Sequence, residues 1–450
     1  MQFELTQDYI NQLKVAVAER DDYFIQGRME ELHVQDIAPI LIELDDEESY
    51  YLFKGLDFET GAQVLREIDP DYRKHFVKQL SIDELADYIE YQESDDAADI
   101  INEQPVKTGE EIIALLEDRE KAGFIRDLLH YDEDCAGGLM AKELIKANIN
   151  WNVKQCIEEI RRQSRNVEQI YSIYVIDNSN KLLGRVSVKR ILLAEDETLI
   201  ADIYESEIIS VESYRDAQEV AEVMRKYDLE VIPVVNVQGK LLGRITIDDI
   251  VDVITEKAEE DIQMMAGISG STDEDDSIWA QSKSRLPWLI IGMLGGILGA
   301  RFIGLFENFI TLVPTMAFFI PLITATGGNV GIQSSSVIVQ DLARDSGPSS
   351  FTMGRFFKGF IVAVVNGVAI AGIVLLFNTV LGEEMKQTIV VSVALFSVVI
   401  LASFTGTMTP LILEKVGVNP ALAAGPFITT ANDLLGLAIY FTVAHYLYLI

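Results

Sequence analysis

The fold is decided by two polar interruptions in the hydrophobic last third of the chain, Pro321-Leu-Ile-Thr-Ala-Thr-Gly-Gly-Asn-Val-Gly-Ile-Gln333 and Gly425-Pro-Phe-Ile-Thr-Thr-Ala-Asn-Asp433. Both lie in segments long enough to cross a bilayer, where amides and a lone carboxylate are costly. Irregular or polar segments at membrane depth are tolerated where they line a water-filled cavity. The sequence therefore predicts that these two stretches face such a path.

Five apolar segments around these interruptions have about the twenty residues or more that a bilayer core requires. They are 286–306, 312–339, 359–381, 388–413 and 421–449. Cytoplasmic loops of membrane proteins carry an excess of lysine and arginine. Here the bases precede the first and fifth spans or separate the second from the third, at Lys283, Arg285, Arg344, Arg355, Lys358 and Lys415. We therefore expect a multi-pass protein of a bacterial-type cytoplasmic (inner) membrane, with its N-terminus inside and its C-terminus outside.

The charge of the chain is concentrated before these spans. The formal net charge is −35 at pH 7, and residues 281–450 hold seven acids against eight bases, so residues 1–280 carry −36. A region this acidic repels itself and does not seek nucleic acid or anionic lipid. It attracts cations; the charge alone favours ordinary solubility as the explanation, and a cation-sensing role is the alternative. Two cysteines, Cys135 and Cys156, and four scattered histidines lack the spacing of a disulfide framework or a zinc site.

Residues 1–130 predict an internally repeated, all-helical solenoid. Apolar residues recur every twelve positions, and each is followed at once by a residue that favours a helix N-cap. The pairs are Leu44 with Asp45, Leu56 with Asp57, Ile68 with Asp69 and Leu80 with Ser81. Further on, Asp95 and Asp99 share one helical face. Such a pair suits a hard cation with oxygen ligands, although acids near a helix start also complement the helix dipole.

A second repeat runs from 131 to 257. Lys181-Leu-Leu-Gly-Arg185 returns as Lys240-Leu-Leu-Gly-Arg244, each between two predicted strands and ahead of a helix. This tandem unit resembles a pair of CBS domains of α+β class, modules that often bind adenine nucleotides through a Ser/Thr-x-x-Asp signature. The second copy has Thr246-Ile-Asp-Asp249, whereas the first has Ser187-Val-Lys-Arg190 and lacks the acid. We therefore expect at most one nucleotide site, at Thr246 and Asp249, with ATP as a possible ligand.

A helical pattern continues from the second copy toward the membrane. Together with a polar hinge from Gly267 to Asp276 it forms a predicted connector over 248–275. We thus expect a multidomain α-helical membrane protein. A cytoplasmic helical solenoid (1–130) and a tandem CBS pair (131–257) are joined by the connector to five transmembrane helices in a pore domain (281–450).

This order of parts, with the Gly-Gly-Asn-x-Gly-x-Gln motif of 327–333 and the later Pro426 and Asp433, resembles the MgtE magnesium channels along essentially the whole chain. The resemblance implies a homodimeric Mg²⁺ channel with its pore on the dimer axis, closed by intracellular Mg²⁺. Asp433 from two copies would grip a hydrated ion, because Mg²⁺ usually keeps its waters and binds one or two carboxylates. Thr429 lies one turn earlier on the same face. The expected pore-lining residues are Gly327, Gly328, Asn329, Gly331, Gln333, Gly425 and Pro426; helix packing alone is the alternative role of the glycines.

The resemblance also implies regulatory Mg²⁺ ligands in the acidic region, namely Asp95, Asp99, Asp228, Asp249, Asp252 and Asp261. Some positions depart from the family pattern. Gln63, Gln218, Lys257 and Asn419 stand where acids are found in the family, and Gly425 replaces an asparagine of some members. Fewer ligands leave the number and affinity of the regulatory sites open.

Two other functions are compatible with the sequence. One is a carrier that couples divalent cations to H⁺ or Na⁺, and the other is a membrane regulator that reads nucleotide through the CBS pair. An enzyme is disfavoured, because the chain shows no nucleophile–base set, P-loop or zinc spacing.

Overall fold

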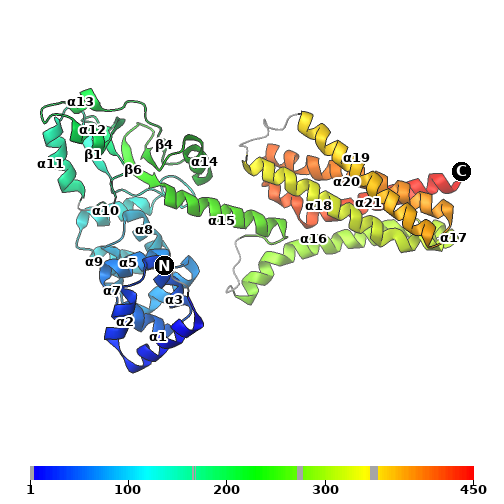
Figure 1. Cartoon of the computed structure of the whole chain (residues 1–450), viewed down its shortest axis with the longest axis horizontal. Coiled ribbons are helices and arrows are strands. Elements are labelled where there is room, and N and C mark those ends of the chain that lie inside the picture. The colour runs from blue at the N-terminus through cyan, green and yellow to red at the C-terminus, as the bar shows by residue number, and fades with distance from the viewer. Residues whose placement is uncertain (1–4, 165–166, 168, 271–276, 345–352, 450) are drawn as a thin grey trace. The chain divides into compact units, whose positions relative to one another are not determined.

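The computed structural model describes residues 5–164, 167, 169–270, 277–344 and 353–449. The chain divides into two compact units, Met1–Ile254 and Thr255–Ile450, which we call the acidic unit and the membrane unit (Figure 1). Residues 271–276 of the predicted hinge lie outside the described residues.

Ten short helices open the acidic unit. They are α1 (Gln7–Glu19), α2 (Asp22–Met29), α3 (Val34–Ile42), α4 (Asp46–Lys54), α5 (Phe58–Glu67), α6 (Pro70–Phe76), α7 (Ile82–Ile89), α8 (Ser94–Asn102), α9 (Val106–Leu115) and α10 (Arg119–Leu128). The expected caps are present: Asp45, Asp57 and Ser81 each accept a hydrogen bond from the backbone N–H three residues later. The apolar residues before them pack into one core. The twelve-residue repeat therefore folds as predicted, one capped helix per repeat.

Two three-stranded sheets follow, one in each CBS copy. The first contains β1 (Ile145–Asn148), β2 (Ile173–Ile176) and β3 (Leu182–Val186), with helices α11 (Val153–Gln163), α12 (Val188–Leu193) and α13 (Ile200–Ile203). The second contains β4 (Val211–Glu212), β5 (Val231–Val235) and β6 (Leu241–Thr246), with α14 (Ala217–Tyr227) and α15 (Ile247–Met265). In each sheet the first pair of strands is parallel and the second antiparallel.

The two glycines of the repeated Leu-Leu-Gly-Arg sequence are explained by a close backbone approach. The Arg185 N–H donates to the Glu205 carbonyl at 3.0 Å, and the Arg244 N–H donates to the Ala141 carbonyl at 2.9 Å. A Cβ at Gly184 would lie 2.0 Å from the Glu205 oxygen, and one at Gly243 would lie 2.5 Å from the Ala141 oxygen. Each copy therefore needs glycine where a neighbouring segment hydrogen-bonds to its last strand.

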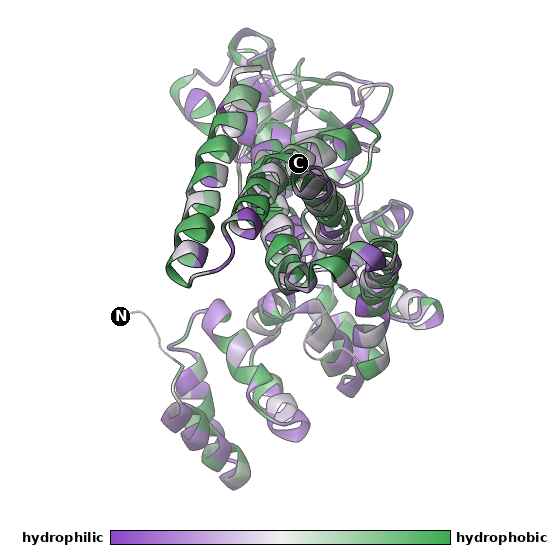
Figure 2. Cartoon of the chain, turned by 90° about the vertical axis from the view of Figure 1, so that its right-hand side faces the viewer, coloured by the Kyte–Doolittle hydropathy of each residue, from purple (hydrophilic) through white to green (hydrophobic). Residues whose placement is uncertain are grey.

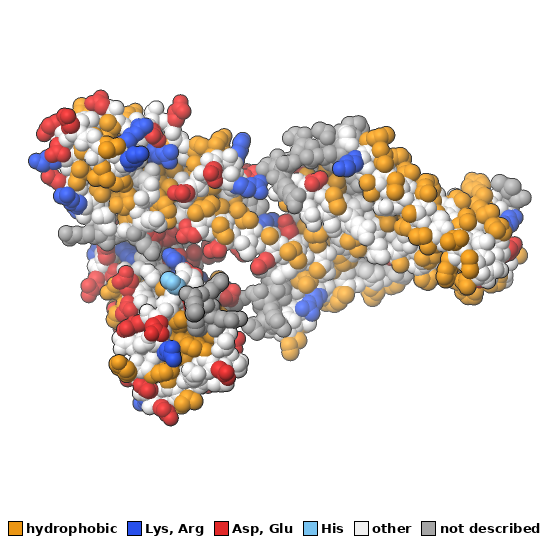
Figure 3. Space-filling model, viewed as in Figure 1, with side chains coloured by type: hydrophobic (Ala, Val, Ile, Leu, Met, Phe, Trp, Pro, Cys, Tyr) orange, Lys and Arg blue, Asp and Glu red, His pale blue; other side chains and the backbone are white. Residues whose placement is uncertain are grey.

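Five long helices form the membrane unit: α16 (Ile278–Gly304), α18 (Ile320–Arg344), α19 (Met353–Val380), α20 (Met385–Lys415) and α21 (Pro426–Leu449). Shorter elements α17 (Glu307–Leu312), η3 (Pro314–Phe319) and η5 (Pro420–Ala424) connect them. Length and composition make all five able to cross a membrane, which confirms the five predicted spans, although the first begins at Ile278 rather than 286. Hydrophobic residues dominate these helices in Figure 2, and in Figure 3 hydrophobic side chains with few charged ones among them are spread over the visible surface of this unit.

Helix α20 is the central helix of the membrane unit. It packs against α18, α19 and α21, and Val391, Leu395 and Val398 lie in the core that these helices share. The two polar stretches of the sequence belong to α18 and to the η5–α21 segment, which pack against each other on α20. The fold thus brings the two interruptions together.

Candidate functional site

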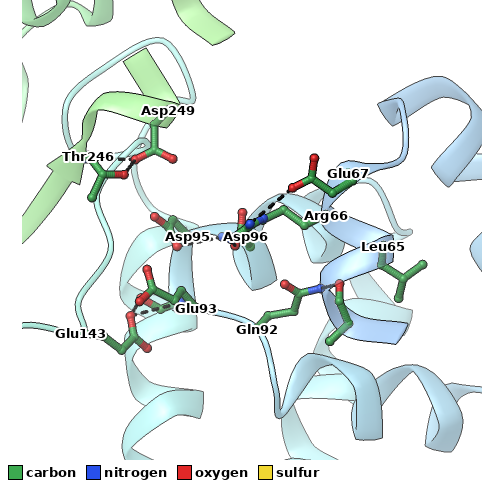
Figure 4. Close-up of polar contacts among 12 residues, drawn as sticks. Leu65, Arg66, Glu67, Gln92, Glu93, Asp95, Asp96, Glu143, Thr246 and Asp249 are labelled. Atoms are coloured by element: carbon green, nitrogen blue, oxygen red, sulfur yellow. Dashed lines mark hydrogen bonds and ion pairs between the residues drawn. The ribbon is translucent and has the colours of Figure 1, made fainter. Parts of the chain in front are cut away.

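Carboxylates gather in the acidic unit where helix α8 meets the start of α15 (Figure 4). Asp95 and Asp96 belong to the first turn of α8, and Asp249 belongs to the first turn of α15. Thr246 holds Asp249, since its hydroxyl and its N–H both donate to Oδ2, at 2.7 and 3.0 Å. We call Glu93, Asp95, Asp96, Glu143 and Asp249 the carboxylate cluster.

The cluster is built by bonds between distant segments. The N–H and hydroxyl of Ser94 donate to Oε2 of Glu143 at 3.1 and 2.6 Å. Arg244 donates to Glu93 at 2.6 Å and to the Glu143 carbonyl at 2.7 Å. Nη1 of Arg66 lies 3.8 Å from Oδ2 of Asp96. Lys121 interacts electrostatically with Glu143 and Glu93. Five acids thus face three bases, so the cluster keeps an excess of negative charge.

Burial destabilises the charged forms of these carboxylates. Desolvation, together with the charges of Asp96 and Asp249, raises the pKa of Asp95 well above its usual range. Desolvation raises the pKa of Asp96 to about 8, although Arg66 opposes the shift. For Asp249 desolvation raises the pKa to about 6 against the hydrogen bond from Thr246. The cluster therefore favours the binding of protons or cations.

The geometry suits a hydrated cation better than a fully chelated one. Among the residues that the structure describes, no three His, Cys, Asp or Glu side chains converge closely enough to hold an ion together. The donors are all oxygens, which suits Mg²⁺, an ion that binds one or two carboxylates and keeps several waters. One or two of these carboxylates plus water fit that ion.

The other acids predicted as regulatory ligands lie at varying distances from the cluster. Asp99 lies at its solvent-exposed rim on α8, and desolvation raises its pKa. Asp252 is one turn beyond Asp249 on α15, where Glu67 and Asp248 add to a pKa that desolvation raises. Asp228 instead ends α14 in a left-handed conformation and lines a separate cavity of about 340 Å³. Gln63 lies on α5 and Gln218 on α14.

The nucleotide signature of the second CBS copy is occupied by internal bonds. Thr246 donates its hydroxyl to Asp249, and Asp249 belongs to the carboxylate cluster. A nucleotide site at these two residues stays a prediction.

In the membrane unit, the glycines of α18 form the surface against which α21 packs. Gly327, Gly328 and Gly331 are buried. A Cβ at Gly328 would lie 3.1 Å from Thr429 Cγ2 and 3.7 Å from Asp433 Oδ1, and one at Gly331 would lie 1.9 Å from Asn432 Nδ2. Within this unit these glycines allow close helix packing, the alternative considered from the sequence, and their place along a pore stays a prediction.

The amides of the same motif occupy another face of α18. Asn329 and Gln333 are exposed, in a stripe that follows helical spacing and consists of Leu322, Ala325, Asn329, Gln333, Val337 and Gln340. Amides facing lipid are costly, so this face meets water or protein in the membrane. Asp433, the single acid of α21, is half-buried beside Gly328. Thr429 lies one turn earlier, near the start of α21, which follows η5 after Gly425.

The end of α15 contacts the segment that leads into α21. Asn419 Nδ2 donates to Asp261 Oδ1 at 2.9 Å, and Lys257 lies 3.9 Å from the same oxygen. A Cβ at Gly425 would lie 3.1 and 3.2 Å from the Met265 and Met264 carbonyl oxygens. The glycine that replaces an asparagine thus allows the end of α15 to approach closely.

Sequence reasoning missed Asp96, Glu93 and Glu143 in the cluster and Asn432 in the membrane unit. Asp96 and Asn432 are direct neighbours of predicted residues, so adjacency was an available signal. Glu143 lies 49 residues from Ser94, to which it bonds, and no local pattern marks it.

Family models match most of the chain. Residues 32–134 match the MgtE intracellular N domain, residues 136–197 and 200–256 match the CBS domain, and residues 320–443 match the MgtE model, described as a divalent cation transporter. These matches agree with the order of parts inferred from the sequence.

Curated relatives align over most of their length. The chain is 31% identical to the magnesium transporter MgtE of Thermus thermophilus, over 97% of both chains. It is 35% identical to that of Enterococcus faecalis, over 72% of both chains. A crystal structure of the cytosolic domain of the Mg²⁺ channel MgtE in complex with ATP covers 54% of this chain and 99% of its own, with 31% identity and a TM-score of 0.51.

The family of divalent cation transporters is not an enzyme class, and the five apolar helices indicate a multi-pass membrane protein. By its relatives and its matched domains, the chain belongs to the MgtE family.

Proposed function

We propose that the protein is a Mg²⁺ channel of the cytoplasmic membrane, that two copies enclose one pore, and that intracellular Mg²⁺ closes this pore through the acidic unit. The observation that carries the proposal is the half-buried Asp433, which lies beside Gly328 on the face of α18 that packs against α21, in a helix long and apolar enough to cross a membrane. The names of the relatives, magnesium transporters, support the choice of ion.

Asp433 would hold the permeant ion by its water shell. Mg²⁺ releases its waters reluctantly, so a site for passage must bind the hydrated ion weakly. One carboxylate from each of two copies, with hydroxyl oxygens from Thr429, supplies charge without a complete inner shell. The amides Asn329 and Gln333 would extend the polar path along α18.

The carboxylate cluster would sense intracellular Mg²⁺. Without a cation, its buried charges repel and weaken the contact between α8 and α15. Each ion that binds only the closed form contributes about 1.4 kcal/mol at roughly nine times its Kd. Moving an equilibrium from 1:99 to 99:1 takes about 5.5 kcal/mol, so about four such ions suffice, and two-fold symmetry would supply them in pairs.

The contact between Asp261 and Asn419 would transmit closure to the pore. Helix α15 starts at the carboxylate cluster and ends beside Pro426, the first residue of the helix that carries Asp433. The direct amide–carboxylate bond needs no bridging ion at this point. Closure would then depend on ions at the cluster rather than at the end of α15.

Replacing Asp433 by asparagine is expected to lower Mg²⁺ flux at least about tenfold. The carboxylate charge is expected to stabilise the ion in the pore by more than about 1.4 kcal/mol, and losing that stabilisation raises the barrier to passage by the same amount. The measurement is Mg²⁺ uptake into liposomes that carry purified protein. Glu307→Gln, an exposed acid on α17, is the control and should leave flux unchanged. Wild-type flux in Asp433→Asn would place the ion site elsewhere.

Asp249→Asn is expected to raise the Mg²⁺ concentration needed for closure several-fold, because a cluster with one carboxylate less binds the ion more weakly. Patch recordings at stepped intracellular Mg²⁺ give this concentration. Glu222→Gln removes an exposed charge on α14 and is the control. Identical closing curves for wild type and Asp249→Asn would contradict a sensing role of the cluster.

The stability of the acidic unit should fall as pH rises in the absence of divalent cations. The raised pKa values of Asp95, Asp96 and Asp249 mean that the folded state binds more protons than the unfolded state between about pH 4 and 8. The free energy of unfolding must then decrease with pH across this window. Mg²⁺ should restore it at pH 8. Thermal unfolding of the full protein in chelator and in Mg²⁺ checks this.

The matched variants for that experiment are Asp96→Asn, which should flatten the pH dependence, and Glu222→Gln, an exposed change on α14, which should not. A unit that grows more stable up to pH 8 without cations would contradict the assignment.

Asn419→Asp is expected to leave more channels open at Mg²⁺ concentrations that close the wild type, because two carboxylates would then face each other where an amide now donates to Asp261. Current at the intracellular Mg²⁺ concentration that half-closes the wild type is the measurement. The exchanged pair Asp261→Asn with Asn419→Asp restores one amide and one carboxylate and should recover wild-type closure. Equal currents in wild type and Asn419→Asp would exclude this contact from gating.

A further inference from the structure

A buried amide joins three helices of the membrane unit next to Asp433. Asn432 is 1% exposed, and its Oδ1 accepts a hydrogen bond of 2.6 Å from the Thr405 hydroxyl of α20. Its Nδ2 lies against Gly331 of α18, where a Cβ would come within 1.9 Å. We call Gly331, Thr405, Gly406 and Asn432 the three-helix clasp.

The two glycines of the clasp bring α18 and α20 into close contact. A Cβ at Gly406 would lie 2.5 Å from the Gly331 carbonyl oxygen, so α20 and α18 also meet at backbone distance. Helix α18 thus touches α20 through one side of Gly331 and α21 through the other. Any side chain at these glycines would push the helices apart.

The hydrogen bond in the clasp constrains rotation rather than only distance. Nδ2 of Asn432 has no hydrogen-bond partner among the described residues, so the bond to Thr405 is the directional polar contact of this amide. Consecutive residues of a helix point about 100° apart. With Asn432 held inward on Thr405, the next side chain must point toward the edge of α21 beside Gly328. That side chain is Asp433.

We propose that Asn432 is a positioning residue for the ion pathway, which acts by fixing the rotation of α21 and with it the place of the Asp433 carboxylate. This inference rests on the proposed role of Asp433 in binding the permeant ion. Asn432 itself points into the helix bundle and does not touch the ion. Its loss would let α21 turn, which changes how the carboxylate meets the hydrated ion.

The test is Mg²⁺ flux into liposomes as a function of external Mg²⁺, with the Mg²⁺ inside kept near zero so that the gate stays open. Asn432→Ala and the isosteric Thr405→Val each remove the same hydrogen bond. Each should raise the half-saturating Mg²⁺ concentration about threefold, the ratio expected for one interhelical hydrogen bond in a membrane. The double variant should be no worse than the more affected single variant.

Two controls separate positioning from general stability. Thr405→Ser keeps the hydroxyl and should retain wild-type half-saturation. Ser403→Ala breaks the Ser334–Ser403 contact of 3.2 Å between α18 and α20, which does not involve α21. It should leave half-saturation unchanged even where the thermal midpoint of the protein falls.

Wild-type half-saturation in Thr405→Val and Asn432→Ala, in proteins whose flux is abolished by Asp433→Asn, would overturn the positioning role and leave the proposed ion site intact. An equal shift in Ser403→Ala would also overturn it, because loss of packing alone would then explain the effect. Unchanged flux in Asp433→Asn would instead refute the proposed ion site itself.

Discussion

Negative charge held away from water is the constraint on which both units depend. In the acidic unit, Asp95, Asp96 and Asp249 lie together, and desolvation raises the pKa of each. In the membrane unit, Asp433 is the single acid of a membrane-spanning helix. A buried carboxylate persists only if a proton, a base or a cation compensates it. At both sites we propose that a hydrated cation does so.

The same constraint links the sites to a regulated ion path. If repulsion between the carboxylates destabilises the cation-free cluster, the conformation of the acidic unit depends on the cation concentration. A sensor requires such a dependence. The helix that begins at this cluster, α15, ends against the η5–α21 segment. If cations bind the cluster more tightly in the closed state than in the open state, their binding at one end of α15 favours the closed packing at the other end.

Much of this architecture could be predicted because it depends on local pattern. Hydropathy located five spans, and the caps at Asp45, Asp57 and Ser81 located the short helices. The repeated Leu-Leu-Gly-Arg located the CBS pair. Asp95 and Asp249 were predicted to belong to one kind of site, and the fold brings them together. Asp228, which the family resemblance grouped with them, lines a cavity apart from the cluster, and its role as a ligand stays a prediction.

The sequence by itself determined the order of the parts, the acidic character of the first unit and the polar positions within the membrane helices, since each follows from residues close together in the chain. Only the tertiary structure decided that Gly328 and Gly331 face α21 and that Gly327 faces α20 and α21, while Asn329 and Gln333 stay exposed. It also decided that Glu143 reaches Ser94 and that Asn432 reaches Thr405. Contacts of that kind join segments tens of residues apart. They depend on how whole helices pack and rotate against one another, which no local pattern specifies.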